Sequence, residues 1–314
     1  MMPRPFRLSA DALAFSLLVA AYVPLRFIIP LPQLVPGQPA LTAILLAGVG
    51  AYWLLDFIAA ARAEAPRWLW RGKWLLVMMA LVLIAIGPTL MIIFVRHQSA
   101  PYLWAHDGLI QNEIAVDYVL AGRNPYIEDY SDTIMALAPF KVSTLTDNPA
   151  LHYYVYLPMT FLLPAVPQSL ATSLLGWFDQ RFLFLALFIG VLVLAGSLVR
   201  HVERQLILTM ILGLNPLTVT YLIEGRNDVM TLFWIVLAVG LVRRGYWRGS
   251  AVVLALACTT KHTAWFFWPF WALYVSGSGM WRERLHRAAG PIGWWAAVSL
   301  AILLPWLVQD AGAF

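Results

Sequence analysis

The segment Trp74–Val95, with the sequence WLLVMMALVLIAIGPTLMIIFV, decides the fold class of this chain. It contains no charged side chain and lies between Lys73 and Arg96. The hydrocarbon core of a bilayer is about 30 Å thick, so a spanning helix needs about 20 consecutive apolar residues. The apolar residues are continuous rather than alternating, which is typical of a membrane helix and not of a barrel strand. The segment is therefore predicted to be a transmembrane helix.

Similar apolar runs fill most of the chain. Of its 314 residues, 61% are hydrophobic and only 12% are charged, about half the charged share of a typical soluble domain. The sequence therefore predicts an all-α, polytopic membrane helix bundle with about eight or nine spans, counting broken ones. The other runs are Leu13–Pro30, Leu41–Ala61, Phe182–Val199, Leu206–Ile223, Val229–Val242 and Trp294–Val308.

Basic residues gather in short loops, which the positive-inside rule places in the cytoplasm. The N-terminus is then cytoplasmic, and the segment 96–152 lies outside the cell (plasma) membrane. The first apolar run lacks a small-residue cleavage site, so we interpret it as a retained span. The net charge of +5 resides in these clusters and does not indicate nucleic-acid binding, and the single cysteine, Cys258, excludes an intrachain disulfide. The clusters are Arg4 and Arg7; Arg62, Arg67, Arg71 and Lys73; Arg200 and Arg204; Arg243, Arg244 and Arg248; Arg282, Arg284 and Arg287.

The segment 96–152 is an acidic interruption between the apolar runs. Within it, Gly108–Ala121 has apolar residues at helical spacing, with Glu113 and Asp117 on another face. This pattern predicts a short juxtamembrane amphipathic helix that ends at Gly122. Seven of the sixteen carboxylates of the chain lie in the segment: Asp107, Glu113, Asp117, Glu128, Asp129, Asp132 and Asp147.

The chain divides into two N-terminal transmembrane helices with a cytoplasmic loop (1–73) and a transmembrane core (74–314). Two stretches of the core are too interrupted or too short to be single spans. Prolines break Tyr153–Trp177, and the parity of membrane crossings leads us to expect a broken or re-entrant pair there. A second pair of short runs flanks Lys261 and His262, which are expected at the tip between two half-spans.

Asp107 is the candidate catalytic residue of the acidic segment. A carboxylate near the outer membrane surface can act as a general base on a hydroxyl acceptor. Asp immediately before a helix is also a favoured N-cap, and the two roles are compatible. Glu113 and Asp117 are read either as part of the site or as a solvated helix face.

Two other polar segments carry candidate residues. The turn Glu224–Asp228 crowds three ionisable groups and an Asn between apolar runs, either as part of a site or as a helix end stabilised by an Arg–carboxylate pair. Lys261 lies in the middle of an apolar stretch, where an ionisable residue indicates function. It either binds a phosphate as a point charge or snorkels to the membrane surface.

Two further charged pairs are expected to be structural. Arg26 and Asp56, in the first two spans, either pair with each other or leave Arg26 to snorkel. Asp179 and Arg181 are read as a pair at the start of a span. No phosphate-binding loop, dinucleotide fingerprint or zinc spacing is present, so neither a nucleotide cofactor nor a metal is expected.

Several short motifs follow one another in a recognisable order from Trp74 to the C-terminus. They are Asp107 in the first long outer loop, Gly122–Tyr126, Tyr156–Pro158, Asp179–Arg181, Asn215–Pro216, Gly225–Asp228 and Thr260–Thr263. Their order and spacing resemble the polytopic GT-C-fold glycosyltransferases. The resemblance is closest to the bacterial glycosyltransferase family 87, the mannosyl- and arabinofuranosyltransferase-like membrane proteins.

The resemblance implies a fold, a reaction and a set of site residues. Such enzymes take a sugar from a polyprenyl-phosphate carrier and transfer it, usually with inversion, to a glycan or lipid acceptor on the outer face. Asp107 would then be the general base, and no cofactor beyond the lipid-linked donor would be required. The residues expected to bind the donor phosphate are Lys261, His262 and Arg226, and those expected to bind substrate are Glu113, Asn124, Tyr126, Asn227 and Asp228.

Two departures from the family pattern keep other interpretations open. Two spans precede the shared core, and the chain stops at Phe314, just beyond a span, so we expect a short member, a fragment or one subunit of a larger membrane complex. A transporter or flippase for a lipid-linked or polar solute would also have broken helices and charge at membrane depth. A non-catalytic subunit that holds a membrane complex together is the third interpretation.

Overall fold

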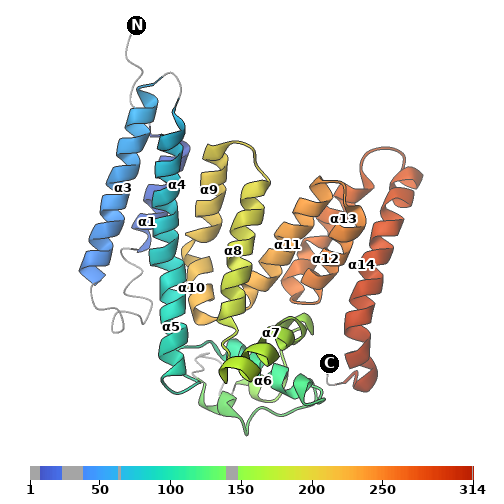
Figure 1. Cartoon of the computed structure of the whole chain (residues 1–314). Coiled ribbons are helices and arrows are strands. Elements are labelled where there is room, and N and C mark those ends of the chain that lie inside the picture. Colours follow the sequence, from blue (N-terminus) through green and yellow to red (C-terminus); the bar gives the residue numbers. More distant parts are fainter. Residues whose placement is uncertain (1–7, 23–37, 63–64, 139–147, 313) are drawn as a thin grey trace. The chain divides into compact units, whose positions relative to one another are not determined.

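The computed structural model describes residues 8–22, 38–62, 65–138, 148–312 and 314. All regular secondary structure in these residues is helical (Figure 1). The chain forms two compact units, one from residues 1–90 and 195–223 and the other from residues 91–194 and 224–314. The prediction of an all-α fold is confirmed.

Within the described residues, three helical segments are long and apolar enough to cross a membrane. They are α3 (Gln38–Ala60), the continuous segment α4–η2–α5 and α14 (Trp281–Gln309). The continuous segment is composed of α4 (Arg67–Leu81), the π-helical turn η2 (Val82–Ile86) and α5 (Gly87–His97).

A fourth span exists if the bent pair α9 (Val202–Gly213) and α10 (Pro216–Glu224) counts as one. The two helices are bent by 48° at the break before Pro216, because proline lacks the N–H and its ring clashes with the preceding turn. Asn215 and Pro216 therefore break the span, as the sequence predicts. A helical membrane protein is the class supported, whereas the predicted eight or nine spans remain a prediction.

The first unit is centred on a buried ammonium group. The side chain of Lys73, on α4, lies 2.8 Å from Asp11 of α1 (Ala10–Ala20) and 2.7 Å from Asp56 of α3. Both carboxylates receive further hydrogen bonds, Asp11 from the Tyr52 hydroxyl and Asp56 from the Ser9 backbone N–H. All three charged side chains are buried. The expected partner of Asp56, Arg26, lies outside the described residues, and Lys73 occupies that role instead.

Replacing Lys73 by methionine is expected to destabilise the protein by about 3–5 kcal/mol, because it leaves two buried carboxylates without their cation. Unfolding of the purified protein in mixed micelles measures the loss. Arg71→Met is the matched control, because Arg71 is exposed two residues earlier on the same helix. A Lys73→Met protein as stable as Arg71→Met would contradict this account.

In the second unit, α6 (Asp107–Leu120) packs against α7 (Met159–Leu175) (Figure 1). The expected broken or re-entrant pair at Tyr153–Trp177 is wrong, because α7 is one helix that continues through both of its internal prolines. It ends at Gly176, whose φ of 77° is the left-handed conformation that glycine adopts readily. Helix α8 (Arg181–Ser197) follows and is apolar but shorter than the candidate spans.

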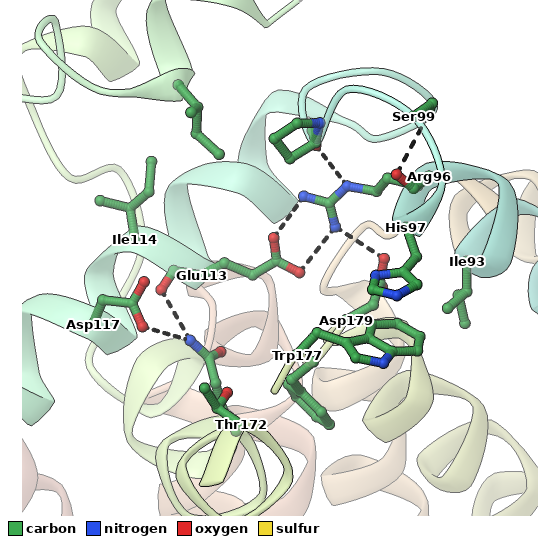
Figure 2. A pocket seen from close by; sticks show the side chains of 14 residues that line it. Ile93, Arg96, His97, Ser99, Glu113, Ile114, Asp117, Thr172, Trp177 and Asp179 are labelled. Atoms are coloured by element: carbon green, nitrogen blue, oxygen red, sulfur yellow. Dashed lines mark hydrogen bonds and ion pairs between the residues drawn. The ribbon is translucent and has the colours of Figure 1, made fainter. Parts of the chain in front are cut away.

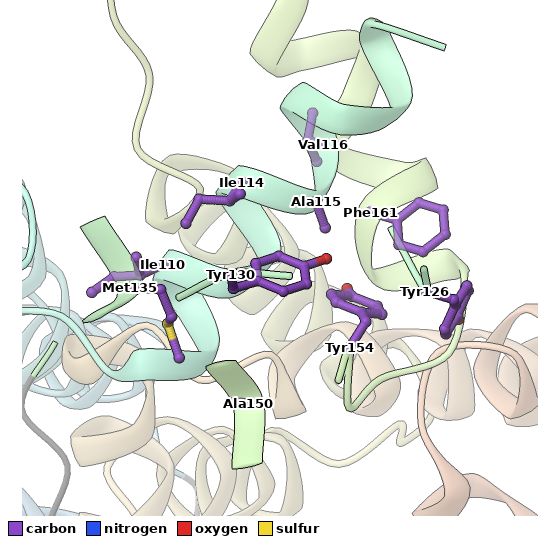
Figure 3. Close-up of a cluster of buried hydrophobic side chains, with 10 residues drawn as sticks. All are labelled: Ile110, Ile114, Ala115, Val116, Tyr126, Tyr130, Met135, Ala150, Tyr154 and Phe161. Carbon is purple, nitrogen blue, oxygen red and sulfur yellow. The ribbon is translucent and has the colours of Figure 1, made fainter. Parts of the chain in front are cut away.

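Helix α6 is where the sequence predicts it, and Gly122 follows its end with a φ of 75°. Its environment differs from the prediction of one apolar stripe, because residues on most of its faces are buried. A tyrosine-rich cluster covers it, with Tyr126, Tyr130 and Tyr154 gathered beside Phe161 of α7 (Figure 3). The α6 residues in this cluster are Ile110, Ile114, Ala115 and Val116. The cluster therefore fixes the helix that begins at Asp107.

The rest of the second unit is a group of apolar helices. Helix α12 (Trp247–Cys258) packs on α11 (Asp228–Arg243) and on α14. The chain then breaks at Lys261, whose backbone is extended, and continues through the turn η5 (His262–Phe266) into α13 (Trp268–Ser276). The two short helices on either side of Lys261 confirm the predicted interruption.

Candidate active site

Two backbone hydrogen bonds join four distant segments of the second unit in two pairs. The N–H of His106, just before α6, donates to the Glu224 carbonyl at 2.8 Å. The N–H of Met159, at the start of α7, donates to the Thr259 carbonyl at 3.0 Å. The first bond holds the start of α6 against the turn before α11, and the second holds the start of α7 against the break after α12. Because α6 packs against α7, the two pairs lie in the same part of the second unit.

Asp107 is the first residue of α6, and His106 occupies the N-cap position that the sequence assigned to Asp107. Its Oδ1 accepts the Gly108 N–H at 2.7 Å, and its Oδ2 accepts the Asn148 side-chain amide at 3.1 Å. His106 Nδ1 lies 2.7 Å from Asp107 Oδ1 and 3.0 Å from the nitrogen of Gly108, whose N–H donates to it.

These hydrogen bonds determine the charge of Asp107. Burial pushes its pKa upward, but the hydrogen bonds from His106, Gly108 and Asn148 outweigh burial and hold the pKa below its ordinary value. The carboxyl group is therefore ionised at neutral pH. Its side chain remains 18% exposed, so the charge is accessible from outside the protein.

Tyr156 lies at the centre of the candidate site. A Cβ atom on Gly108 would lie 2.2 Å from the Tyr156 hydroxyl oxygen, so the tyrosine approaches the helix where only glycine leaves room. Burial, together with the nearby carboxylates of Asp107 and Asp228, raises the pKa of Tyr156 to about 12. Lys261 Nζ lies 5.9 Å from the centre of the tyrosine ring, a cation–π distance.

The turn Glu224–Asp228 supplies the remaining charges. Gly225 has a φ of 81°, and a Cβ there would meet the Leu109 side chain of α6 at 2.5 Å. Asp228 Oδ1 accepts from Lys261 Nζ at 2.8 Å, and Glu224 Oε2 accepts from Arg226 Nε at 2.7 Å. The side chains of Lys261 and Arg226 are 25% and 35% exposed. Both cations are thus paired yet accessible.

Four of the residues expected from the sequence lie outside this group. Asn124 accepts the Tyr126 backbone N–H in a turn, and the Tyr126 hydroxyl donates to the Tyr156 carbonyl. These two residues therefore stabilise the backbone next to the site rather than contact its charged groups. His262 is exposed and contacts the edge of Trp265. Glu113 belongs to a separate ion network.

That network includes Arg96, at the end of α5. Its guanidinium donates to both oxygens of Glu113, at 3.0 and 2.7 Å, and to Asp179 at 2.9 Å (Figure 2). Arg181 binds the same Asp179 with two hydrogen bonds, so the predicted Asp179–Arg181 pair is present. Of the two interpretations of Glu113, the solvated helix face is wrong, because its carboxylate forms a largely buried bidentate pair with Arg96. Burial raises its pKa against the opposing effect of Arg96.

A cavity of about 380 Å³ borders this network. The ring of Trp177 stacks on His97 at its edge, with centroids 3.8 Å apart, and Asp117 accepts a hydrogen bond from Gln168 there (Figure 2). The cavity contains neither Asp107 nor Lys261 in its lining. It is therefore a feature separate from the candidate site.

Sequence reasoning missed several side chains of the site. Tyr156 was noted only within the motif Tyr156–Pro158, and Asn148 was not singled out. Neither has a spacing that indicates contact with Asp107. Polar residues that flank a proline within an apolar stretch are the signal that would have drawn attention to both.

Comparison with family models, curated proteins and solved structures finds no match to this chain. Function must therefore be argued from the geometry. The candidate site combines an ionised, accessible carboxylate with two accessible cations and a partly buried tyrosine. Such a group can accept a proton from a hydroxyl and bind a phosphate.

Replacing Gly108 by alanine is expected to destabilise the protein by about 1–3 kcal/mol, because the added methyl group overlaps the Tyr156 hydroxyl. Gly108→Ala/Tyr156→Phe should recover part of this loss, since it removes the overlapping oxygen. Gly50→Ala is the control, because the space around Gly50, in the middle of α3, is open; it should stabilise by about 0.5–1 kcal/mol. Equal stability of Gly108→Ala and the wild type in denaturant titration would refute the close approach.

Proposed function

We propose that the chain is an integral membrane glycosyltransferase that uses a polyprenyl-phosphate-linked sugar and modifies an acceptor on the outer face of the membrane. The observation that carries the proposal is the meeting of ionised Asp107 with Lys261 around Tyr156. These residues are far apart in the sequence and come from three separate segments. The order of motifs that resembles GT-C glycosyltransferases supports the same assignment.

The proposed reaction is a displacement at the anomeric carbon of the sugar. The oxygen of an acceptor hydroxyl forms a bond to this carbon while the bond from the carbon to the phosphate oxygen breaks. The hydroxyl proton passes to the Asp107 carboxylate, and polyprenyl phosphate departs with the bonding electron pair. Attack from the face opposite to the phosphate inverts the configuration. Because Asp107 is ionised at neutral pH, it is ready to receive the proton.

Lys261 and Arg226 act on the leaving phosphate rather than on the acceptor hydroxyl. The departing phosphate gains negative charge, and a nearby ammonium or guanidinium group stabilises that charge most strongly where water is scarce. Lys261 pairs with Asp228, and Arg226 pairs with Glu224. A bound phosphate adds a further acceptor, while Asp228 and Asn227 orient the ammonium group of Lys261.

Asp107→Asn is expected to give a folded, membrane-inserted protein that has lost sugar transfer by about 10²–10⁴-fold, because the amide cannot accept the proton. Mass spectrometry of lipids and glycans from cells that carry the wild type or the variant measures the product. Asp129→Asn is the matched control, because Asp129 is an exposed carboxylate of the same acidic segment.

The same experiment separates the proposal from its alternatives. A glycan product that persists at wild-type level in Asp107→Asn contradicts the proposed base. Translocation of a lipid-linked solute by reconstituted vesicles without any glycan product would instead favour a transporter or flippase. A membrane partner that co-purifies with both proteins, with no product from either, would favour a non-catalytic subunit.

Lys261→Ala is expected to weaken use of the lipid-phosphate donor by roughly ten-fold or more, as expected when a charged hydrogen-bonding partner is lost. The dependence of product formation on the amount of polyprenyl-phosphate sugar added to membranes measures this effect. Lys261→Arg keeps the charge and should retain most of the activity. If all three proteins show the same donor dependence, Lys261 does not bind the donor.

A further inference from the structure

A second cavity lies among helices α11–α14 of the second unit, at the ends of α11, α12 and α13 that are far from Lys261. Its volume is about 900 Å³, and it is lined by the end of α11, the start of α12, the end of α13 and the first half of α14. Glycines line much of it, which leaves space between the helices. Four glycines contribute: Gly245, Gly249, Gly277 and Gly290.

The mouth of this cavity combines aromatic and basic side chains. Trp247 and Tyr274 face each other with ring centroids 6.3 Å apart, and both are exposed. Arg248, His286 and Arg287 belong to the same lining. Tryptophan and tyrosine beside basic residues are typical of the level where lipid headgroups meet the hydrocarbon.

The charges at this mouth are not neutralised within the described part of the chain. Arg287 donates to the backbone carbonyls of Glu283 and Ser278, which bear no net charge. Arg248 and Arg287 form no ion pair with a described residue. Glu283, one turn before Arg287 on α14, is not part of the cavity lining and borders the adjacent pocket that contains His286 and Arg287. The cavity is thus apolar inside and cationic at its mouth.

We propose that this cavity binds an anionic glycerophospholipid from the cytoplasmic leaflet. The basic clusters Arg243–Arg248 and Arg282–Arg287 place this end of the helices in the cytoplasm by the positive-inside rule. Basic pockets between membrane helices on that side bind anionic lipid headgroups. The phosphate contacts Arg248 and Arg287, and the part of an acyl chain nearest the headgroup fills the space beside Gly249. The site is distinct from the group around Asp107 and does not depend on the proposed reaction.

Native mass spectrometry of the full chain tests the site. The protein is reconstituted in vesicles with equal amounts of phosphatidylglycerol and phosphatidylcholine and then extracted in mild detergent. The wild type should retain phosphatidylglycerol in clear excess. Arg248→Gln/Arg287→Gln should reduce this excess about thirty-fold, since each of the two basic residues contributes about 1 kcal/mol to the attraction of an anionic lipid.

Two matched controls separate the cavity from general charge effects. Arg200→Gln/Arg204→Gln removes the same charge from a different basic cluster and should retain the lipid as the wild type does. Gly249→Leu keeps every charge but fills the cavity, and should lose the lipid; Gly293→Leu, on the same unit but outside the lining, should keep it.

The proposal is overturned if the wild type retains both lipids equally. It is also overturned if the double arginine variant, or Gly249→Leu, retains phosphatidylglycerol at the wild-type level. Both Leu variants replace glycine within a helix by a better helix former, so a loss confined to Gly249→Leu reports on the cavity rather than on unfolding.

Discussion

The second unit depends on two arginines that share one carboxylate. Asp179 accepts hydrogen bonds from Arg96 and Arg181, and Arg96 also holds Glu113. Two positive and two negative charges therefore cancel within one buried group. Arg181 donates in addition to the Trp104 carbonyl, two residues before His106. The group thus joins the end of α5, the middle of α6 and the start of α8, and it fixes the loop that leads into Asp107.

The first unit uses the same principle with a different donor set. One ammonium group, Lys73, serves two buried carboxylates, and the remaining negative charge is balanced by hydrogen bonds from neutral groups. Tyr52 donates to Asp11, and Ser9 donates to Asp56 through both its N–H and its hydroxyl. Removing a single partner from such a group costs more than the group as a whole contributes, because a buried charge is left unpaired.

The sequence predicts the helices well because their signals are local. Apolar length locates the long helices, Pro216 locates the bend between α9 and α10, and Gly122 locates the end of α6. The prediction at Tyr153–Trp177 was wrong for a physical reason. The hydrophobicity of a segment indicates that it is buried, but not whether lipid or another part of the protein covers it. Helix α7 packs on α6, and its two prolines remain within the helix instead of breaking it.

The candidate site was predictable only in part because its contacts are non-local. Asp107, Lys261 and the Glu224–Asp228 turn were recognised as unusual charges in an apolar chain. Nothing in the sequence pairs Lys73 with Asp11, or Arg96 with Glu113, since each pair joins different helices. The N-cap was misplaced by one residue, because His106 and Asp107 are both polar and adjacent, and only the backbone angles distinguish them.

The ion pairs that stabilise this fold have filled their hydrogen-bonding capacity, whereas those that can bind a ligand have not. Asp179 receives hydrogen bonds from two guanidinium groups and is almost completely buried, so it has no capacity left for another partner. Lys261 has one carboxylate and one amide oxygen as neighbours and keeps a quarter of its side chain exposed. An ammonium group has three protons to donate, so a third acceptor can bind without breaking either contact. This difference is the physical reason to assign the phosphate to Lys261 rather than to the more strongly bound arginines.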